Sequence, residues 1–152
     1  YVWIAGEGPL EQELKAHCAR LGLDDRVRFL GWRNDRGALL AACDVVAFPS
    51  RYEPFGTVTV DAWAGSRPLV AADAVGPAAY VKDGVNGLLI PKNDVDALAD
   101  ALRKVVTDKD LAAKLVAGGR ASYEAQFTKA VFQRDSIALY KKIAAHAGPF
   151  AG

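Results

Sequence analysis

The chain has 152 residues, of which 51% are hydrophobic and 24% charged, and its 19 basic and 18 acidic residues give a formal net charge of +1. A globular chain of this length can bury one sizeable core, and the balanced composition excludes intrinsic disorder. The charges are interspersed without a long basic run, which argues against nucleic acid as a partner.

The start of the chain, YVWIA, is an apolar stretch without a preceding methionine. We therefore expect that the chain is truncated at its N-terminus, at the edge of a strand. No apolar run approaches the roughly 20 residues of a membrane span, so we expect a cytoplasmic protein.

Short apolar runs alternate with amphipathic stretches along the sequence. Runs bounded by Gly, Pro or Asp predict strands at residues 1–5, 26–30, 44–48, 68–72 and 87–90. The stretches between and after them predict helices at residues 10–22, 35–43, 57–64, 77–82, 94–107, 110–118 and 128–146. Alternating strands and helices predict an α/β fold with a Rossmann-like parallel sheet and helices on both faces. We expect one domain over residues 1–146, followed by a loose tail at 147–152.

The stretch RYEPFGTVTVDA at residues 51–62 has the features of a ligand site. Ligands of open α/β sheets bind at the carboxyl ends of the strands, where loops lead into helices. Pro54 keeps Glu53 out of the helix, and a helix beginning near Thr57 leaves its first amides without internal partners. Those amides and the helix dipole favour an anion, and Gly56 has no Cβ to block its approach.

Two carboxylates border this predicted anion site, from Glu53 before the helix and from Asp61 four residues after Thr57. They would repel a bare phosphate, but each can accept hydrogen bonds from a pair of sugar hydroxyls. A nucleotide sugar has this layout, with sugars on both sides of its diphosphate. The alternative on spacing alone is an ordinary helix start with two solvated acids.

At these residues the sequence resembles the retaining glycosyltransferases of the GT-B fold, of the large group-1 (family four) type. That family carries two glutamates separated by seven residues in a stretch like EPFG followed by a helix. The motifs GEGP, VRFLGW, ACDVVAFPSRYEPFG, RPLVAAD, DGVNGLLIP and ALADAL follow in the family's order. The resemblance covers essentially the whole chain and corresponds to the C-terminal, donor-binding domain.

The resemblance implies a role for each matching residue. Glu53 would be the catalytic residue and contact hydroxyls of the donor sugar, and Asp61 would bind the ribose. The other implied contacts are the diphosphate at Phe55, Gly56 and Thr57, the nucleobase at the loop of Leu30 and Gly31, and the sugar-phosphate end at Gly76.

The implied reaction transfers a sugar from a UDP- or GDP-type nucleotide sugar to an acceptor hydroxyl with retention, in bacterial cell-surface glycan or glycolipid synthesis. It requires no cofactor or metal, and the sequence contains no cluster of His and Asp residues. Catalysis would consist of positioning the donor and stabilising charge on the departing diphosphate. The partner expected in cis is an acceptor-binding N-terminal domain, and any membrane association would run through it. This chain alone is expected to be inactive.

Some residues depart from the family's pattern. Asp61 replaces the second glutamate, Val75 the first glycine of a frequent Gly-Gly pair, and Ala79 a common glutamate. Two alternatives therefore stay open: a nucleotide- or partner-binding module without catalysis, and a GT-B nucleotide-sugar isomerase, in which the EPFG pattern is usually absent.

Overall fold

The computed structural model describes residues 1–146, and the chain divides into two compact units, Tyr1–Leu39 and Leu40–Gly152. The boundary between the units falls within helix α2 (Arg36–Ala42). The single domain expected over residues 1–146 stays a prediction, and the tail expected at residues 147–152 lies outside the described residues.

The first unit is a βαβ arrangement. Strand β1 (Val2–Ala5) pairs in parallel with β2 (Val27–Gly31), and α1 (Glu11–Arg20) connects them. A hydrogen bond joins the ends of the two strands, because the Gly6 amide donates to the carbonyl of Gly31, the last residue of β2, at 2.8 Å. The parallel pairing follows from the intervening helix, since a hairpin cannot join parallel strands.

The second unit contains a three-stranded parallel sheet. Its strands are β3 (Val46–Phe48), β4 (Leu69–Ala72) and β5 (Leu88–Ile90), in the order β3-β4-β5. The register pairs Val46 with Leu69 and Val70 with Leu88. Among residues 1–146, the predicted strands thus form two parallel sheets, one in each unit, and the predicted α/β class is confirmed.

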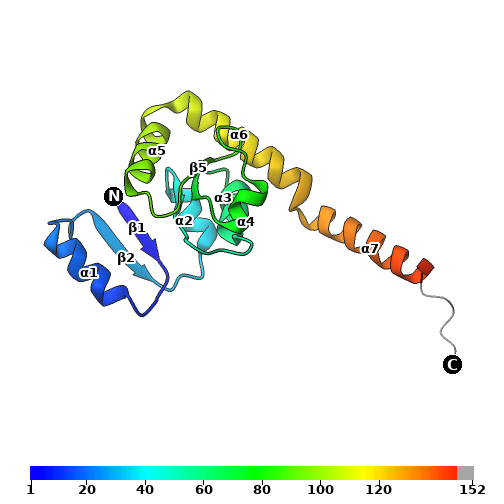
Figure 1. Ribbon diagram of the computed structural model, residues 1–152, viewed down its shortest axis with the longest axis horizontal. Coiled ribbons are helices and arrows are strands. Elements are labelled where there is room, and N and C mark those ends of the chain that lie inside the picture. Colours follow the sequence, from blue (N-terminus) through cyan, green and yellow to red (C-terminus); the bar gives the residue numbers. More distant parts are fainter. Residues whose placement is uncertain (147–152) are drawn as a thin grey trace. The chain divides into compact units, whose positions relative to one another are not determined.

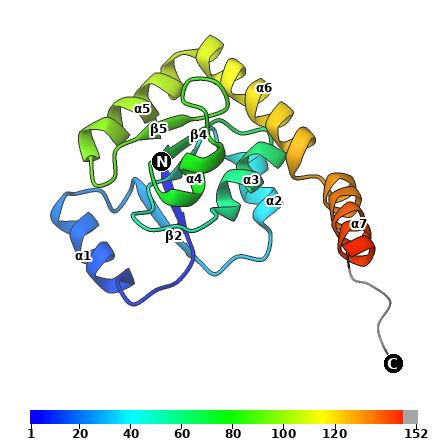
Figure 2. The ribbon, with the colours of Figure 1, turned by 45° about the vertical axis from the view of Figure 1, so that its right-hand side comes forward.

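Helices cover both faces of the sheet in the second unit, as Figures 1 and 2 show. On one face lie α3 (Thr57–Ala64), which packs with α6 (Lys109–Gln126), and α4 (Val75–Tyr80). Trp63, only 1% exposed, fills the core there beside Leu69. On the other face α5 (Val95–Thr107) packs against Val70. The central strand β4 is buried on both sides, which explains its continuous apolar sequence.

Helix α6 (Lys109–Gln126) extends well beyond the predicted end at residue 118. The predicted end was wrong because two consecutive glycines, Gly118 and Gly119, are typical of the end of a helix. In the structure these glycines let α6 approach its neighbours: a Cβ at Gly118 would lie 2.1 Å from the Val85 carbonyl oxygen, and one at Gly119 2.4 Å from Cδ1 of Trp63. Tertiary packing therefore requires the glycines inside the helix.

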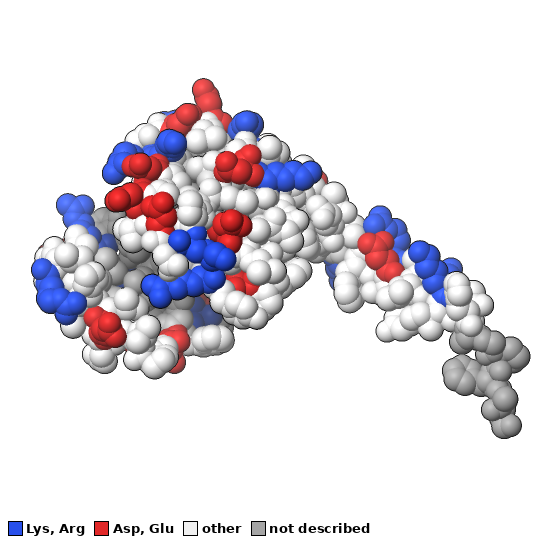
Figure 3. All heavy atoms as spheres, in the orientation of Figure 1, with Lys and Arg blue, Asp and Glu red and all other residues white. Residues whose placement is uncertain are grey.

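The last described helix, α7 (Lys129–His146), leads away from the sheet of the second unit in Figures 1 and 2. None of its residues is buried. On the face shown in Figure 3, acidic and basic side chains are interspersed over the second unit. Within the described part of the chain, no helix combines the length and the apolar character that crossing a bilayer would need.

Candidate functional site

The predicted site lies at the carboxyl edge of the sheet in the second unit. The loop after β3 contains Glu53 and leads into α3, which begins at Thr57 as predicted. The loop after β4 leads into α4, whose second residue is Gly76. Because parallel strands end at one edge, the two loops meet there.

The Glu53 carboxylate folds back onto the turn that precedes α3. Its Oε1 accepts hydrogen bonds from the Gly56 amide at 2.9 Å and from the Phe55 amide at 3.2 Å. The half-buried carboxylate is thus fixed through one oxygen, and its second oxygen is directed to no amide of this turn. The arrangement presents a preorganised hydrogen-bond acceptor.

A glycine is required at position 56. Its φ of +84° lies in the left-handed region, and a Cβ there would lie 3.1 Å from the Phe48 ring and 3.2 Å from the Tyr80 hydroxyl. The glycine lets the chain turn sharply so that both amides reach Glu53. The sequence predicts a glycine here because a ligand must approach the start of the helix. The crowded interior is a second, independent reason for the glycine.

Gly76 connects the start of α4 to the loop that contains Glu53. Its amide donates to the Glu53 carbonyl at 2.7 Å, and a Cβ at Gly76 would lie 2.4 Å from the Phe55 carbonyl oxygen. The structure therefore places Gly76 directly against the turn of Glu53, and its predicted contact with the sugar-phosphate end of the donor stays a prediction. Val75, which precedes it, is 70% exposed.

The first amides of α3 divide into two groups. Phe55 and Gly56 donate to Glu53, whereas Thr57 and Val58 occupy the first turn, where the helix offers no carbonyl to their amides. Asp61 follows one turn later on α3 and is half-buried. The predicted residues Glu53, Phe55, Gly56, Thr57 and Gly76 thus lie together, and their roles stay predictions.

Leu30 and Gly31 belong to the first unit, at the carboxyl end of β2. The Gly31 carbonyl accepts the Gly6 amide, and the Trp32 amide donates to Oε1 of Glu7 at 3.3 Å. Two loops of this unit are therefore joined at its carboxyl edge, and the predicted nucleobase contact of Leu30 and Gly31 stays a prediction.

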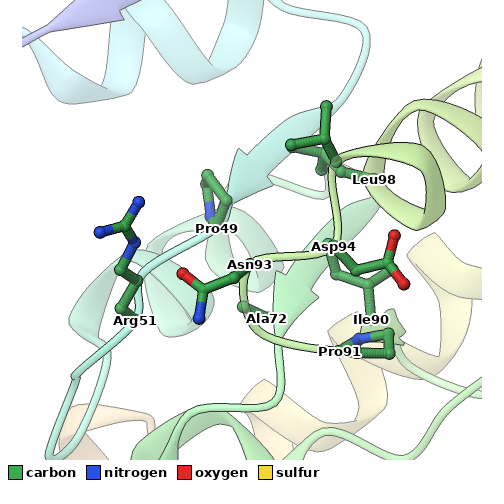
Figure 4. A pocket seen from close by; sticks show the side chains of 9 residues that line it. Pro49, Arg51, Ala72, Ile90, Pro91, Asn93, Asp94 and Leu98 are labelled. Carbon is green, nitrogen blue, oxygen red and sulfur yellow. The ribbon is translucent and has the colours of Figure 1, made fainter.

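A pocket of about 190 Å³ opens at the carboxyl edge of the second unit, between the ends of the three strands and the start of α5. Figure 4 shows Arg51 and Asn93 on one side of it, with the carboxylate of Asp94 pointing away from them. That carboxylate caps α5 by accepting the Ala97 amide at 2.8 Å. Complete small-molecule sites are roughly 300–1,000 Å³, so this pocket fits part of a ligand.

Sequence reasoning missed two residues that shape the site. The Tyr80 hydroxyl donates to the Gly56 carbonyl at 3.3 Å, and buried Asn86 holds the following turn through Lys82 and Ser122. An asparagine within DGVNG signals a turn. The tyrosine in an alanine-rich helix carries no such signal, because its partner is distant in sequence.

Parallel strands, crossover helices and a helix start at the carboxyl edge define the doubly wound α/β class, whose ligands bind at that edge. Residues 1–122 match the family described as glycosyl transferases group 1. The chain belongs to this family, which confirms the resemblance seen in the sequence.

Individual relatives agree with this assignment. The chain is 35% identical over 129 residues, 85% of its length, to the lipopolysaccharide core biosynthesis glycosyltransferase LpsE of Rhizobium meliloti (strain 1021). It is 40% identical over 81% of its length to a D-inositol 3-phosphate glycosyltransferase of Stackebrandtia nassauensis. It spans 38% and 28% of these two relatives, respectively.

Solved structures show the same fold. Anabaena HepE, in complex with UDP and glucose, superimposes with a TM-score of 0.84 at 34% identity, over 91% of this chain and 40% of that one. Sucrose-phosphate synthase from Thermosynechococcus elongatus gives a TM-score of 0.85 at 28% identity, over 94% and 38%. These neighbours are GT-B glycosyltransferases, so the predicted fold of half a GT-B architecture is confirmed.

Proposed function

We propose that this chain is the donor-binding half of a retaining glycosyltransferase that uses a UDP- or GDP-type nucleotide sugar and no metal. The sugar would pass to an acceptor hydroxyl in bacterial cell-surface glycan or glycolipid synthesis, in the cytoplasm. Similarity to a lipopolysaccharide core glycosyltransferase and to a structure with UDP and glucose supports the proposal. The acceptor would bind a further domain, since the relatives are much longer than this chain.

The observation that carries the proposal is the turn of Glu53. One carboxylate oxygen is fixed by two amides, which leaves the other to accept hydroxyls of the donor sugar. The Thr57 amide, at the positive end of α3, would take a diphosphate oxygen, with Phe55 and Gly56 shaping the turn. Asp61, one turn along α3, would accept the ribose hydroxyls. The same donors would stabilise charge on the departing diphosphate.

Glu53→Gln separates the two tasks of this side chain. The glutamine carbonyl can still accept the Phe55 and Gly56 amides, but its amide group cannot accept from a sugar. In the full-length protein we expect sugar transfer to fall about 100-fold, by analogy with the removal of one stabilising group at a reacting centre. Affinity for UDP or GDP should stay within about threefold, well below the tenfold change that 1.4 kcal/mol produces.

The control is Asp73→Asn, which makes the same chemical change at an exposed acid in the neighbouring loop. Transfer is measured as nucleotide released from a panel of nucleotide sugars, and binding by calorimetry. Unchanged transfer in Glu53→Gln would refute the role of Glu53. A wild-type protein that binds nucleotide but transfers no sugar would favour the non-catalytic module, and conversion of the donor without acceptor would favour the isomerase.

A further inference from the structure

Tyr80 contacts the candidate site from the protein interior. It is the last residue of α4, and its hydroxyl donates to the Gly56 carbonyl at 3.3 Å. Its ring belongs to a cluster with Phe55, Trp63 and Phe127, at centroid distances of 5.6, 5.9 and 5.6 Å. The packed ring limits the positions that the hydroxyl can take, so the bond to Gly56 is directed by the core.

The Gly56 carbonyl and the Thr57 amide are the two ends of one peptide group. The carbonyl accepts the Tyr80 hydroxyl and also the Thr59 amide, at 2.9 Å. A hydrogen bond accepted at the carbonyl polarises the peptide, which strengthens its N–H as a donor. The two bonds also fix the plane of the peptide and therefore the direction of the Thr57 N–H.

We propose that Tyr80 is a positioning residue for the donor diphosphate: through the Gly56 carbonyl it orients and polarises the peptide whose N–H, on Thr57, binds a phosphate oxygen. This inference rests on the proposed function, since it assigns Tyr80 to the same nucleotide-sugar site. Tyr80 acts through the peptide and does not touch the donor.

The Tyr80 hydroxyl keeps its proton under assay conditions. Burial raises the pKa of this phenol above its ordinary value of 10.0, and the negative charge of Glu53 raises it further. The hydroxyl therefore remains a donor throughout the neutral range. Gly56 is therefore held from two sides: its amide donates to Glu53, and its carbonyl accepts the Tyr80 hydroxyl.

Tyr80→Phe in the full-length protein removes the hydroxyl and keeps the ring. UDP, or GDP if the wild type prefers it, should bind about three- to tenfold more weakly, the effect of losing one hydrogen bond. The matching nucleoside, followed by ligand-observed NMR at millimolar concentration, should bind as to wild type because it has no diphosphate. Loss of packing alone would not distinguish the two ligands.

Tyr123→Phe is the matched control, since Tyr123 packs against the same cluster and the structure gives its hydroxyl no hydrogen bond among residues 1–146. Its affinity for both ligands should equal that of wild type. Equal loss of nucleotide and nucleoside affinity in Tyr80→Phe, or no loss of either, would overturn the inference while leaving the proposed function intact. Failure of the wild type to bind either diphosphate would overturn both.

Discussion

Adding one methyl group at Gly76 tests how the two loops of the site are held together. A Cβ there would lie 2.4 Å from the carbonyl oxygen of Phe55, 2.5 Å from its carbonyl carbon and 2.7 Å from its Cα. All three are backbone atoms, so no side-chain rotation can relieve the contact. Gly76 lies within α4, where helix propensity alone would favour alanine over glycine. The expected loss of stability therefore comes from this contact. The loops must move apart, which breaks the 2.7 Å hydrogen bond from the Gly76 amide to Glu53.

The expected cost of Gly76→Ala has two parts. Overpacking of a crowded interior costs about 1–3 kcal/mol. Loss of the amide hydrogen bond adds about 0.5–1.5 kcal/mol. The free energy of unfolding should therefore fall by about 2–4 kcal/mol, which corresponds to a decrease of about 4–16 °C in Tm for a chain of this size.

Thermal unfolding followed by circular dichroism measures this change. Gly37→Ala is the control, because Gly37 lies in α2 with no heavy atom within 4 Å of an added Cβ, and its replacement should leave Tm unchanged or raise it. Nucleotide affinity of Gly76→Ala should fall as well, since the turn of Glu53 moves with the loop. A Tm within about 2 °C of wild type, together with wild-type nucleotide affinity, would refute this account of the clamp.

Further predictions concern the supports around the site. Asn86→Ala should lower the free energy of unfolding by about 2–4 kcal/mol in urea titrations, because three partly buried hydrogen bonds within the 80–86 turn and to α6 lose their partner. A loss under about 1 kcal/mol would contradict this. Asp94→Ala and Asp108→Ala should each cost about 1 kcal/mol through loss of a helix cap, without changing nucleotide affinity. If both variants unfolded at the urea concentration of the wild type, the two caps would contribute nothing to the free energy of unfolding.

The sequence predicted most of the fold because its signals are local. The five strands found among residues 1–146 and the start of α3 follow from apolar runs and from the glycine and proline residues at their ends. The predicted end of α6 was wrong because Gly118 packs against Val85 and Gly119 against Trp63, and both partners are distant in sequence from the glycines. Trp3 in the apolar strand β1 is 44% exposed, because composition alone does not show which face of a strand is covered.

The candidate site divides in the same way. The spacing of Glu53, Gly56 and Thr57 could be predicted because a proline and a glycine fix where the helix begins. The sequence could not show that Glu53 accepts a hydrogen bond from the Gly56 amide, since a carboxylate in a loop can equally well face solvent with both oxygens. The contribution of Tyr80 was equally hidden, because it depends on α4 lying against α3.

The departures from the family's pattern in α4 fall on one side of that helix. Val75 and Ala79 are exposed, whereas Gly76 and Tyr80 are buried or half-buried and form hydrogen bonds to the turn of Glu53. Substitutions on the exposed side of α4 change the surface that faces a ligand. They leave unchanged the backbone of Gly56, which Tyr80 and Glu53 hold through hydrogen bonds. The proposed anion-binding end of α3 would therefore remain intact while a preference for the donor sugar changed, so Val75 and Ala79 do not argue against the proposed enzyme.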